Sequence, residues 1–409
     1  MSPKLITLER YVKVASGALY TFLIAKFLGS ELYGVYSYNF ALISLIGMFA
    51  LNGLDSLFQK KLSEKNVKSN LFFEFFFIKF TCLTVALTIY VVFCFINNSN
   101  LSVLFYVFLP YIFTLPFSMI YQGLVYERKV KGIVVVSIIN MSFSNLLRVY
   151  LFMNSNNIEL FAASYVIEQL IYLVGYFYFY FDRDDFNLIQ KKDIKPIFIS
   201  SKSILKDAWA LSLSAIMVGC FSRVTLFFLE SNESMSEVGK YALILRVSDA
   251  MVILAASSSL IKMRELLDAK KMKICDYEKS LQNYKINMYF LSISSALIMF
   301  FSLYYLVPIV FGSEYVFSFL SCIYSSMIVL FNFVAIYTGR VLVVESFYKI
   351  AMIRNAIALL SLMTISYFFV PKLGIEGALI SLSISWAISS FFILLFIKKT
   401  RHMVIPFHA

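Results

Sequence analysis

We single out ten charged residues inside the long apolar stretches of this 409-residue chain, where a charge is costly unless it meets protein, water or a ligand. Asp55, Glu74, Lys79 and Arg354 are four of them, and the other six are candidates for a site. These six are Lys26, Arg148, Arg223, Arg246, Glu168 and Asp249. The planar guanidinium group of arginine can bind phosphate oxygens through two parallel hydrogen bonds. The four cations therefore predict a water-filled, net cationic cavity that binds an anionic substrate, while the two anions provide ion coupling or charge balance.

Some of these charges could instead be structural pairs. Arg246 and Asp249 are spaced i, i+3 and would share one helix face, where they could neutralise each other. Arg148 and Glu168 stand on successive apolar stretches and could form a buried ion pair. The sequence leaves both alternatives open.

Some charged residues lie close enough to a membrane surface for their side chains to reach water, and others do not. Lys26 could extend its ammonium group to the outer surface. Asp55, Glu74 and Arg354 lie near the cytoplasmic surface, and we expect their side chains to extend to water there. Arg223 has no partner close in the sequence, which makes it the strongest single candidate for the site.

The body of the chain contains no histidine and no CxxC pair, which common catalytic and metal centres require. Both histidines, His402 and His408, lie near the C-terminus, so HExxH chemistry and Ser-His or Cys-His centres are excluded elsewhere. The five cysteines form no CxxC pair. Asp182 and Asp184 resemble an acidic pair of glycosyltransferases, but a lone acidic pair at the end of an apolar stretch is usually only a solvated helix end. We predict a protein that is not an enzyme and uses no metal or cofactor.

Long apolar stretches must position the charged residues. Hydrophobic residues make up 60% of the chain and charged residues only 15%, whereas soluble domains are about a quarter charged. A helix needs about 20 apolar residues to cross the bilayer core. The stretches are 12–28, 35–58, 72–96, 101–125, 132–153, 158–181, 208–229, 238–261, 286–311, 315–338, 349–370 and 374–397. They predict an all-α polytopic membrane protein with about twelve transmembrane helices.

The basic residues indicate the orientation of these helices. The chain has 36 Lys and Arg against 24 Asp and Glu, and one set of alternate connections contains 28 of the basic residues. The opposite connections contain only Lys240 and Lys372. Cytoplasmic loops carry the positive excess, so both termini are predicted to be cytoplasmic. Because topology explains the net charge, we expect no nucleic-acid partner.

A weak repeat divides the chain into two halves. SELYGVY begins at Ser30 and SEVGKY at Ser236, so that Gly34 and Gly239 are 205 positions apart. Parallel repeats of this kind predict two pseudo-symmetric six-helix lobes around a central cavity. Pro110 and Pro116 predict a kink in the fourth stretch.

The predicted domain boundaries follow from this division. The N-lobe is expected over residues 1–181, a cytoplasmic linker over 182–207 and the C-lobe over 208–409. A charged cytoplasmic loop is expected at 262–285 within the C-lobe.

Several turn motifs resemble those of Wzx-type polysaccharide flippases, which belong to the multidrug/oligosaccharidyl-lipid/polysaccharide exporter superfamily. FLGSELYGVY begins at Phe27, VGKY at Val238, FGSEY at Phe311 and PKLGIEGA at Pro371. The resemblance covers the whole chain, and its motifs are mostly structural turns. One position departs from the family pattern, because Thr225 stands where an acid often follows the arginine of the seventh helix.

The resemblance implies a flippase of the bacterial inner membrane. Its substrate would be an undecaprenyl-pyrophosphate-linked oligosaccharide, such as an O-antigen unit of lipopolysaccharide, moved by alternating access. Helices 1, 2, 7 and 8 would line the cavity, which selects Lys26, Arg223, Arg246 and Asp249. The implied partners are this lipid-linked substrate, the lipid bilayer, and a polysaccharide polymerase with its chain-length machinery.

Two other functions remain open. A multidrug or metabolite antiporter could have the same fold, but it would favour an acidic cation site over a cationic cavity. A membrane glycan polymerase commonly carries a sizeable outer loop, whereas every predicted outside connection here is short.

Overall fold

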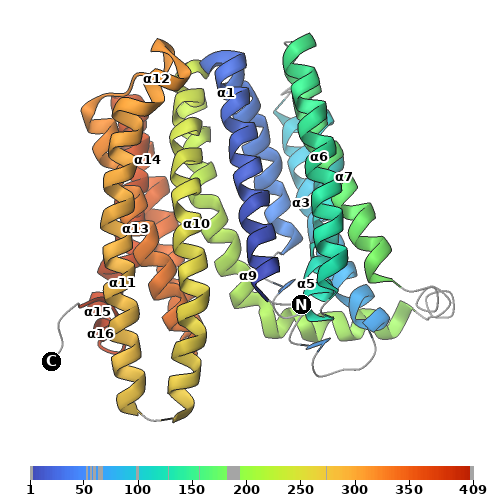
Figure 1. Ribbon diagram of the computed structural model, residues 1–409, viewed down its shortest axis with the longest axis vertical. Helices are drawn as coiled ribbons and strands as arrows, with labels where there is room; N and C mark the ends of the chain where they lie inside the picture. The colour runs from blue at the N-terminus through green and yellow to red at the C-terminus, as the bar shows by residue number, and fades with distance from the viewer. Residues whose placement is uncertain are drawn as a thin grey trace. The chain divides into compact units, whose positions relative to one another are not determined.

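The computed structural model describes residues 3–51, 68–97, 101–127, 129–155, 157–181, 194–272 and 274–405, with residues 54, 55, 58, 61 and 62. The described chain is helical and contains no strand (Figure 1). Its α-helices up to residue 230 are α1 (Pro3–Gly47), α3 (Lys68–Ile96), α4 (Val103–Thr114), α5 (Met119–Tyr126), α6 (Val130–Asn154), α7 (Ile158–Tyr180) and α9 (Ile194–Glu230). The later α-helices are α10 (Met235–Met272), α11 (Ile274–Phe301), α12 (Val307–Phe311), α13 (Phe319–Val344), α14 (Tyr348–Ala387), α15 (Ile393–Phe396) and α16 (Arg401–Val404). Short 3-10 or π segments are η1 (Met48–Ala50), η2 (Leu115–Ser118), η3 (Ser302–Leu306), η4 (Ser313–Tyr315) and η5 (Ile388–Phe392).

Nine helices in the described part of the chain are long and apolar enough to cross a membrane. Two of them contain a glycine in the left-handed region, Gly29 (φ 73°) and Gly374 (φ 53°), where two helices meet at a kink. A side chain at these positions would be strained, which is why glycine occupies both kinks. The all-α polytopic membrane fold is confirmed, and the number of twelve transmembrane helices stays a prediction.

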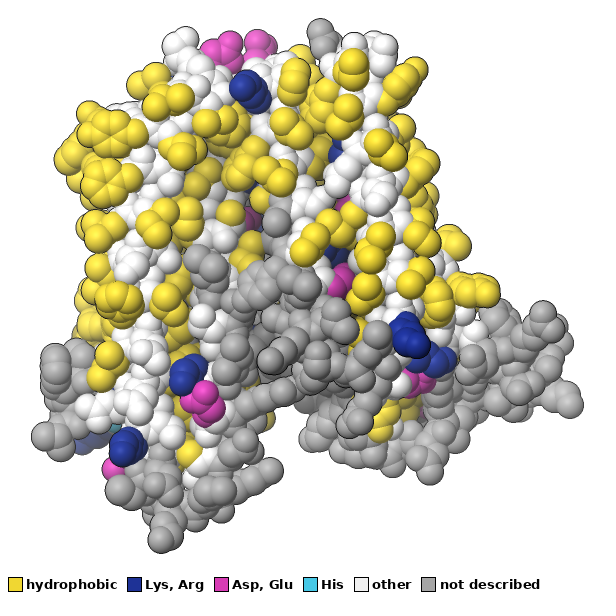
Figure 2. All heavy atoms as spheres, in the orientation of Figure 1, with side chains coloured by type: hydrophobic (Ala, Val, Ile, Leu, Met, Phe, Trp, Pro, Cys, Tyr) yellow, Lys and Arg dark blue, Asp and Glu magenta, His cyan; other side chains and the backbone are white. Residues whose placement is uncertain are grey.

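Large apolar side chains are exposed along these helices. Phe95, Ile309 and Phe396 are each more than 80% exposed. In Figure 2, hydrophobic side chains cover much of the described surface, and only a few charged side chains interrupt them. A face of this kind is stable against lipid but not against water.

The helices belong to two compact units. The first unit contains Met1–Phe27 and Tyr38–Gly219, and the second contains Leu28–Ser37 and Cys220–Ala409. Helix α1 therefore contributes a central segment to the second unit and its two ends to the first. The lobe boundaries expected from the sequence stay a prediction.

Helices extend through both regions that were expected to be cytoplasmic connections. Within 182–207, residues 194–207 belong to α9, and the rest, with Asp182 and Asp184, lies outside the described residues. Within 262–285, α10 continues to residue 272 and α11 begins at residue 274. The lysines, glutamates and leucines of this segment favour helix, so charge alone does not end α10 or α11.

Side-chain caps and one proline set several helix boundaries in the first unit. The Ser102 hydroxyl accepts a hydrogen bond from the backbone N–H of Phe105, which begins α4. Asn157 caps α7 by accepting from the N–H of Glu159 at 2.8 Å. Between α4 and α5, the 3-10 segment η2 contains Pro116 and interrupts the α-helical hydrogen bonding, while Pro110 lies inside α4. The kink expected from these two prolines stays a prediction.

The second unit is held together by a close crossing of α1 and α10. A Cβ atom at Gly34 would lie 1.8 Å from the Met235 carbonyl oxygen, and one at Gly239 would lie 1.9 Å from that of Ser30. The Ser30 and Ser236 hydroxyls are 2.7 Å apart beside this contact. The two glycines that mark the sequence repeat therefore contact each other, because only glycine permits this approach.

The described end of the chain also packs on the second unit. The Lys285 ammonium group donates to the carbonyl oxygens of His402 and Ile405 at 2.9 and 2.7 Å. His402 also lies 3.2 Å from the Glu345 carboxylate. These contacts fix α16 against α11 and α13, while His408 lies outside the described residues.

Replacement of Gly34 or Gly239 by alanine should lower the stability of the protein. The added methyl group has no space against a backbone oxygen, so we expect a loss of about 1–3 kcal/mol in the free energy of unfolding. Thermal unfolding of the purified protein measures this, with Gly17→Ala as the control because a Cβ there contacts nothing within 4 Å. Equal stability of Gly34→Ala and Gly17→Ala would contradict the close crossing.

Candidate functional site

Arg223 and Arg246 lie on the two helices of a hairpin in the second unit. A short turn joins α9 to α10, and the hydroxyl groups of Thr225 and Tyr241 are 2.6 Å apart across the pair. Both arginines interact electrostatically with Asp249 on α10. The electrostatic surroundings of Asp249 therefore include Arg223 on the neighbouring helix as well as the i, i+3 neighbour on its own helix.

Tyr33 completes this group from the central segment of α1. Its side chain is fully buried, and its hydroxyl lies within electrostatic range of Arg246 and Asp249, although it makes no hydrogen bond within the described residues. Arg223 and Arg246 are half-buried, whereas Asp249 is an exposed residue. We name Tyr33, Arg223, Arg246 and Asp249 the arginine cluster. Two cations against one anion leave it with net positive charge.

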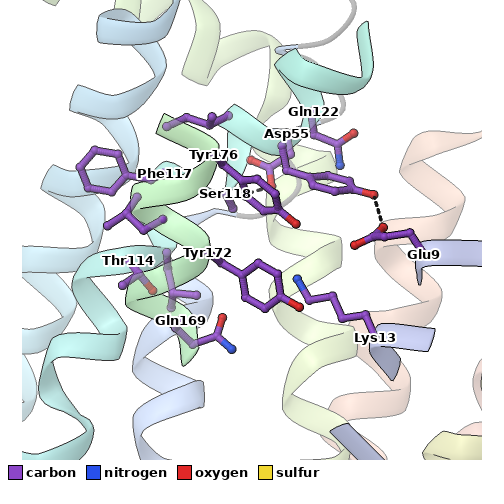
Figure 3. Close-up of a pocket in the computed structure, with 14 residues that line it drawn as sticks. Glu9, Lys13, Asp55, Thr114, Phe117, Ser118, Gln122, Gln169, Tyr172 and Tyr176 are labelled. Carbon is purple, nitrogen blue, oxygen red and sulfur yellow. Dashed lines mark hydrogen bonds between the residues drawn. The ribbon is translucent and has the colours of Figure 1, made fainter. Parts of the chain in front are cut away.

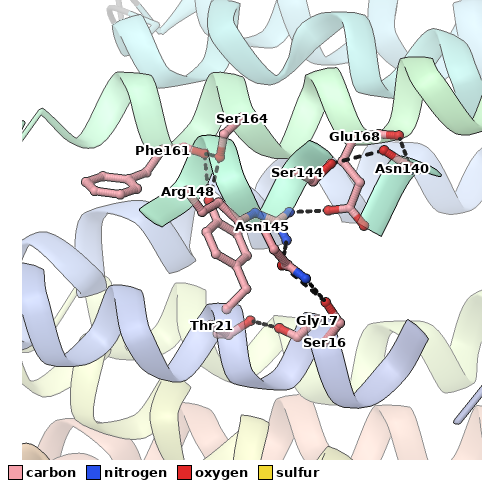
Figure 4. A network of polar contacts seen from close by, with 11 residues as sticks. Ser16, Gly17, Thr21, Asn140, Ser144, Asn145, Arg148, Phe161, Ser164 and Glu168 are labelled. Carbon is pink, nitrogen blue, oxygen red and sulfur yellow. Dashed lines mark hydrogen bonds and ion pairs between the residues drawn. The ribbon is translucent and has the colours of Figure 1, made fainter. Parts of the chain in front are cut away.

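Arg148 and Glu168 form an ion pair inside the first unit (Figure 4). The Arg148 guanidinium group also lies over the Tyr20 ring, 3.6 Å from its centroid. The Tyr20 hydroxyl donates to the Phe161 carbonyl oxygen at 2.7 Å. The pair links α6 to α7 and is the structural alternative that the sequence left open for these two residues.

Neutral side chains extend this pair into a network. The Asn140 amide donates to the Glu168 carbonyl oxygen at 2.9 Å and accepts from the Ser144 hydroxyl at 3.0 Å. Asn145 lies between Arg148 and Ser16 of α1 (Figure 4). Such hydrogen bonds are what a buried charge pair needs to offset its desolvation.

The six charges named from the sequence fall into separate groups. The structure brings Arg223, Arg246 and Asp249 together in the second unit, and it pairs Arg148 with Glu168 in the first. Lys26 lies in the first unit near the kink of α1, and its side chain is exposed.

A third charge pair was missed by the sequence analysis. Lys79 is 0% exposed, forms an ion pair with Asp55 and donates to the Ser118 hydroxyl at 2.7 Å. Ser118 in turn donates to Asp55 at 2.8 Å. The expectation that Asp55 extends to water is therefore wrong, because the buried ammonium group of Lys79 requires a counter-charge.

Arg354 also departs from its expected position. It is 5% exposed and donates to the Thr338 hydroxyl at 2.8 Å and to the Ala335 carbonyl oxygen at 3.3 Å. The predicted extension to water is wrong here too, since α13 supplies acceptors that compensate for burial.

A cavity of about 450 Å³ lies within the first unit (Figure 3). We name it the tyrosine cavity, and its lining includes Lys13, Tyr121, Gln122, Gln169, Tyr172 and Tyr176. The Lys13 ammonium group lies 3.6 Å from the Tyr172 ring centroid, a cation–π contact. Glu9 and Asp55 also line the cavity.

The carboxylate of Glu9 is held in place at the edge of this cavity. It accepts from the Ser137 hydroxyl at 2.5 Å and from the Tyr121 hydroxyl at 3.4 Å. The sequence analysis counted Lys13 only as a topology signal and did not single out Glu9. The spacing of Lys13, Tyr172 and Tyr176 in the chain gives no sign that they meet.

Comparisons with known proteins identify the fold. The chain matches no protein-family model and no curated protein. The structure is similar to that of the lipid II flippase MurJ in an inward closed conformation, with 16% identity and a TM-score of 0.75 over 98% of this chain and 89% of that chain. It is also similar to a multidrug resistance MATE family transporter of the MOP superfamily. The inward-facing conformation gives 12% identity and a TM-score of 0.70, covering 96% of this chain and 94% of that chain. The outward-facing conformation gives 14% identity and a TM-score of 0.59, covering 97% and 95%. At these identities the likeness shows a shared fold.

Removal of one partner from the Arg148–Glu168 pair should destabilise the protein more than removal of both. Glu168→Ala leaves a buried unpaired guanidinium group, and we expect a loss of about 3–5 kcal/mol in the free energy of unfolding. Arg148→Met with Glu168→Leu should recover most of it. Unfolding of the full chain in detergent measures both variants. The exposed pair Lys262–Glu265 provides the control, since Glu265→Ala should cost less than about 1 kcal/mol. A stable Glu168→Ala variant would contradict a structural role.

Proposed function

We propose that the protein is a flippase that moves an undecaprenyl-pyrophosphate-linked oligosaccharide across the bacterial cytoplasmic membrane by alternating access. The observation that carries this proposal is the arginine cluster, which places surplus positive charge on helices of a multi-pass membrane protein. The fold shared with a lipid II flippase supports a substrate of lipid-linked type. The sugar units would be those of O-antigen or a similar surface polysaccharide.

The arginine cluster suits the pyrophosphate group of such a lipid. Two guanidinium groups can each donate paired hydrogen bonds to phosphate oxygens. Asp249 offsets part of their charge, which favours release after translocation over permanent binding. Lys26, an exposed residue of the first unit, stays a predicted substrate-binding residue, whereas Arg148 is paired with Glu168.

The basic connections of the sequence set the proposed direction of transport. Both termini would lie in the cytoplasm, where lipid-linked oligosaccharides are assembled. The protein would deliver its substrate unchanged to the outer leaflet, where a polysaccharide polymerase and chain-length machinery act on it. No catalytic step is required of the chain.

A multidrug antiporter is the second candidate, and one observation favours it. The carboxylate of Asp249, an exposed residue, could bind a cation, and the MATE transporter has a similar fold. The two arginines beside Asp249 would oppose a cationic substrate. Export of a cationic dye from cells that express the protein would support this candidate.

Loss of the arginine cluster should trap the lipid-linked oligosaccharide on the cytoplasmic face. Cells that lack the gene would be complemented with the wild type or with Arg223→Ala/Arg246→Ala. The leaflet of the lipid-linked intermediate and the amount of surface polysaccharide would then be measured. We expect about a hundredfold less surface polysaccharide in the double variant, because two charge-assisted hydrogen-bonding groups are lost.

Two further variants and two possible results test this proposal. Arg401→Ala, an exposed arginine of α16, should behave as the wild type. Arg223→Lys should restore part of the transport, since lysine keeps the charge but not the planar fork. Normal surface polysaccharide in the double variant, at normal protein levels, would exclude the arginine cluster as the binding site. Intermediate that reaches the outer leaflet in cells without the gene would argue against flipping.

A further inference from the structure

We propose that the tyrosine cavity of the first unit binds a neutral sugar residue of the transported glycan. This inference rests on the proposed flippase function and adds a second binding site to it. The arginine cluster would hold the pyrophosphate group, and the tyrosine cavity would recognise the oligosaccharide. The volume of about 450 Å³ falls in the usual range of small-molecule sites, about 300–1,000 Å³.

Two amide side chains provide the hydrogen-bonding capacity. Gln122 of α5 and Gln169 of α7 both line the cavity and are half-buried. Within the described part of the chain, neither amide makes a hydrogen bond. Each amide offers two donors and one acceptor, and a sugar hydroxyl group both donates and accepts. A polyhydroxylated ligand would use this capacity in full.

Aromatic rings provide the apolar part of the lining. The Tyr172 and Tyr176 rings lie 5.5 Å apart between centroids, and Tyr121 lies 5.6 Å from Tyr176. Figure 3 shows Lys13 extended toward Tyr172. A sugar ring has apolar C–H faces and a polar hydroxyl rim. Tyr172 and Tyr176 are only 4% and 7% exposed, and Lys13 covers the Tyr172 ring, so the rings contribute small apolar areas to the lining. These areas, together with the amides, match both parts of a sugar ring.

The charges around the cavity favour a neutral ligand over an anion or a cation. Glu9 and Lys13 line it together with Asp55, whose carboxylate is paired with Lys79. These two cations and two anions balance. A pyrophosphate group would need surplus positive charge, as in the arginine cluster, and a cationic drug would need surplus negative charge.

The position of the cavity in the chain suits loading from the cytoplasm. Its lining comes from the beginning of α1, the η2–α5 junction and the second half of α7. In the proposed orientation, these segments lie toward the cytoplasmic face. An oligosaccharide assembled on that face would therefore meet the cavity before translocation.

Two lipid probes separate this site from the arginine cluster. The first is undecaprenyl pyrophosphate, which has no sugar. The second is the lipid-linked oligosaccharide extracted from host cells that lack this gene. Binding of both probes to the full-length protein in nanodiscs would be measured by native mass spectrometry. We expect Gln122→Ala/Gln169→Ala to weaken binding of the second probe about tenfold and to leave the first unchanged. Arg223→Ala/Arg246→Ala should weaken both.

A control variant and three possible results distinguish failure of the sugar site from failure of the flippase proposal. Gln282→Ala replaces an exposed glutamine of α11 and should bind both probes as the wild type does. Unchanged binding of the second probe to the Gln122/Gln169 variant, or an equal loss for both probes, would overturn the sugar site alone. Unchanged binding of undecaprenyl pyrophosphate to this variant also shows that it is folded. Failure of the wild type to bind either probe would overturn the flippase proposal.

Discussion

The cost of a charge in a membrane-spanning helix governs the polar structure of this protein. An ionised side chain at the centre of a helix costs about 2.5–3.5 kcal/mol on insertion scales. The first unit offsets this cost by strict pairing, with Lys79 bound to Asp55 and Arg148 bound to Glu168. Arg354 in the second unit is instead compensated by neutral acceptors. Paired charges of this kind stabilise helix contacts but offer little to a ligand.

The arginine cluster differs in composition from the structural pairs, because it contains two cations and one anion. Asp249 interacts electrostatically with both Arg223 and Arg246. All three residues are at least partly exposed. Such a group would suit an anionic part of a ligand. Within the tyrosine cavity the charges already cancel, so shape and hydrogen bonding would determine what binds there.

Hydropathy predicted the fold because each transmembrane helix must be apolar along its own length, which is a local property. Pro116 lies in a 3-10 segment, because proline acts on the local backbone. Gly34 and Gly239 were predicted as equivalent positions of a repeat within turn motifs, but the structure places them inside α1 and α10, where they allow a close helix crossing. The pair of Lys79 with Asp55 could not be predicted in the same way. Their contact depends on which helix faces meet, and nothing in the spacing of 24 residues indicates that choice.

Helix α1 contributes residues to both units and to both candidate sites. Its central segment, Leu28–Ser37, belongs to the second unit, while its ends belong to the first. The Gly34–Gly239 crossing anchors that segment through backbone contact, and Tyr33 of the same segment interacts with the arginine cluster. The beginning of α1 supplies Glu9 and Lys13 to the tyrosine cavity. Helix α9 is likewise shared between the two units, which divide at Gly219 and Cys220. Gly29 separates the part of α1 that lines the tyrosine cavity from the part that reaches the arginine cluster, because a glycine accommodates the positive φ of this kink without strain.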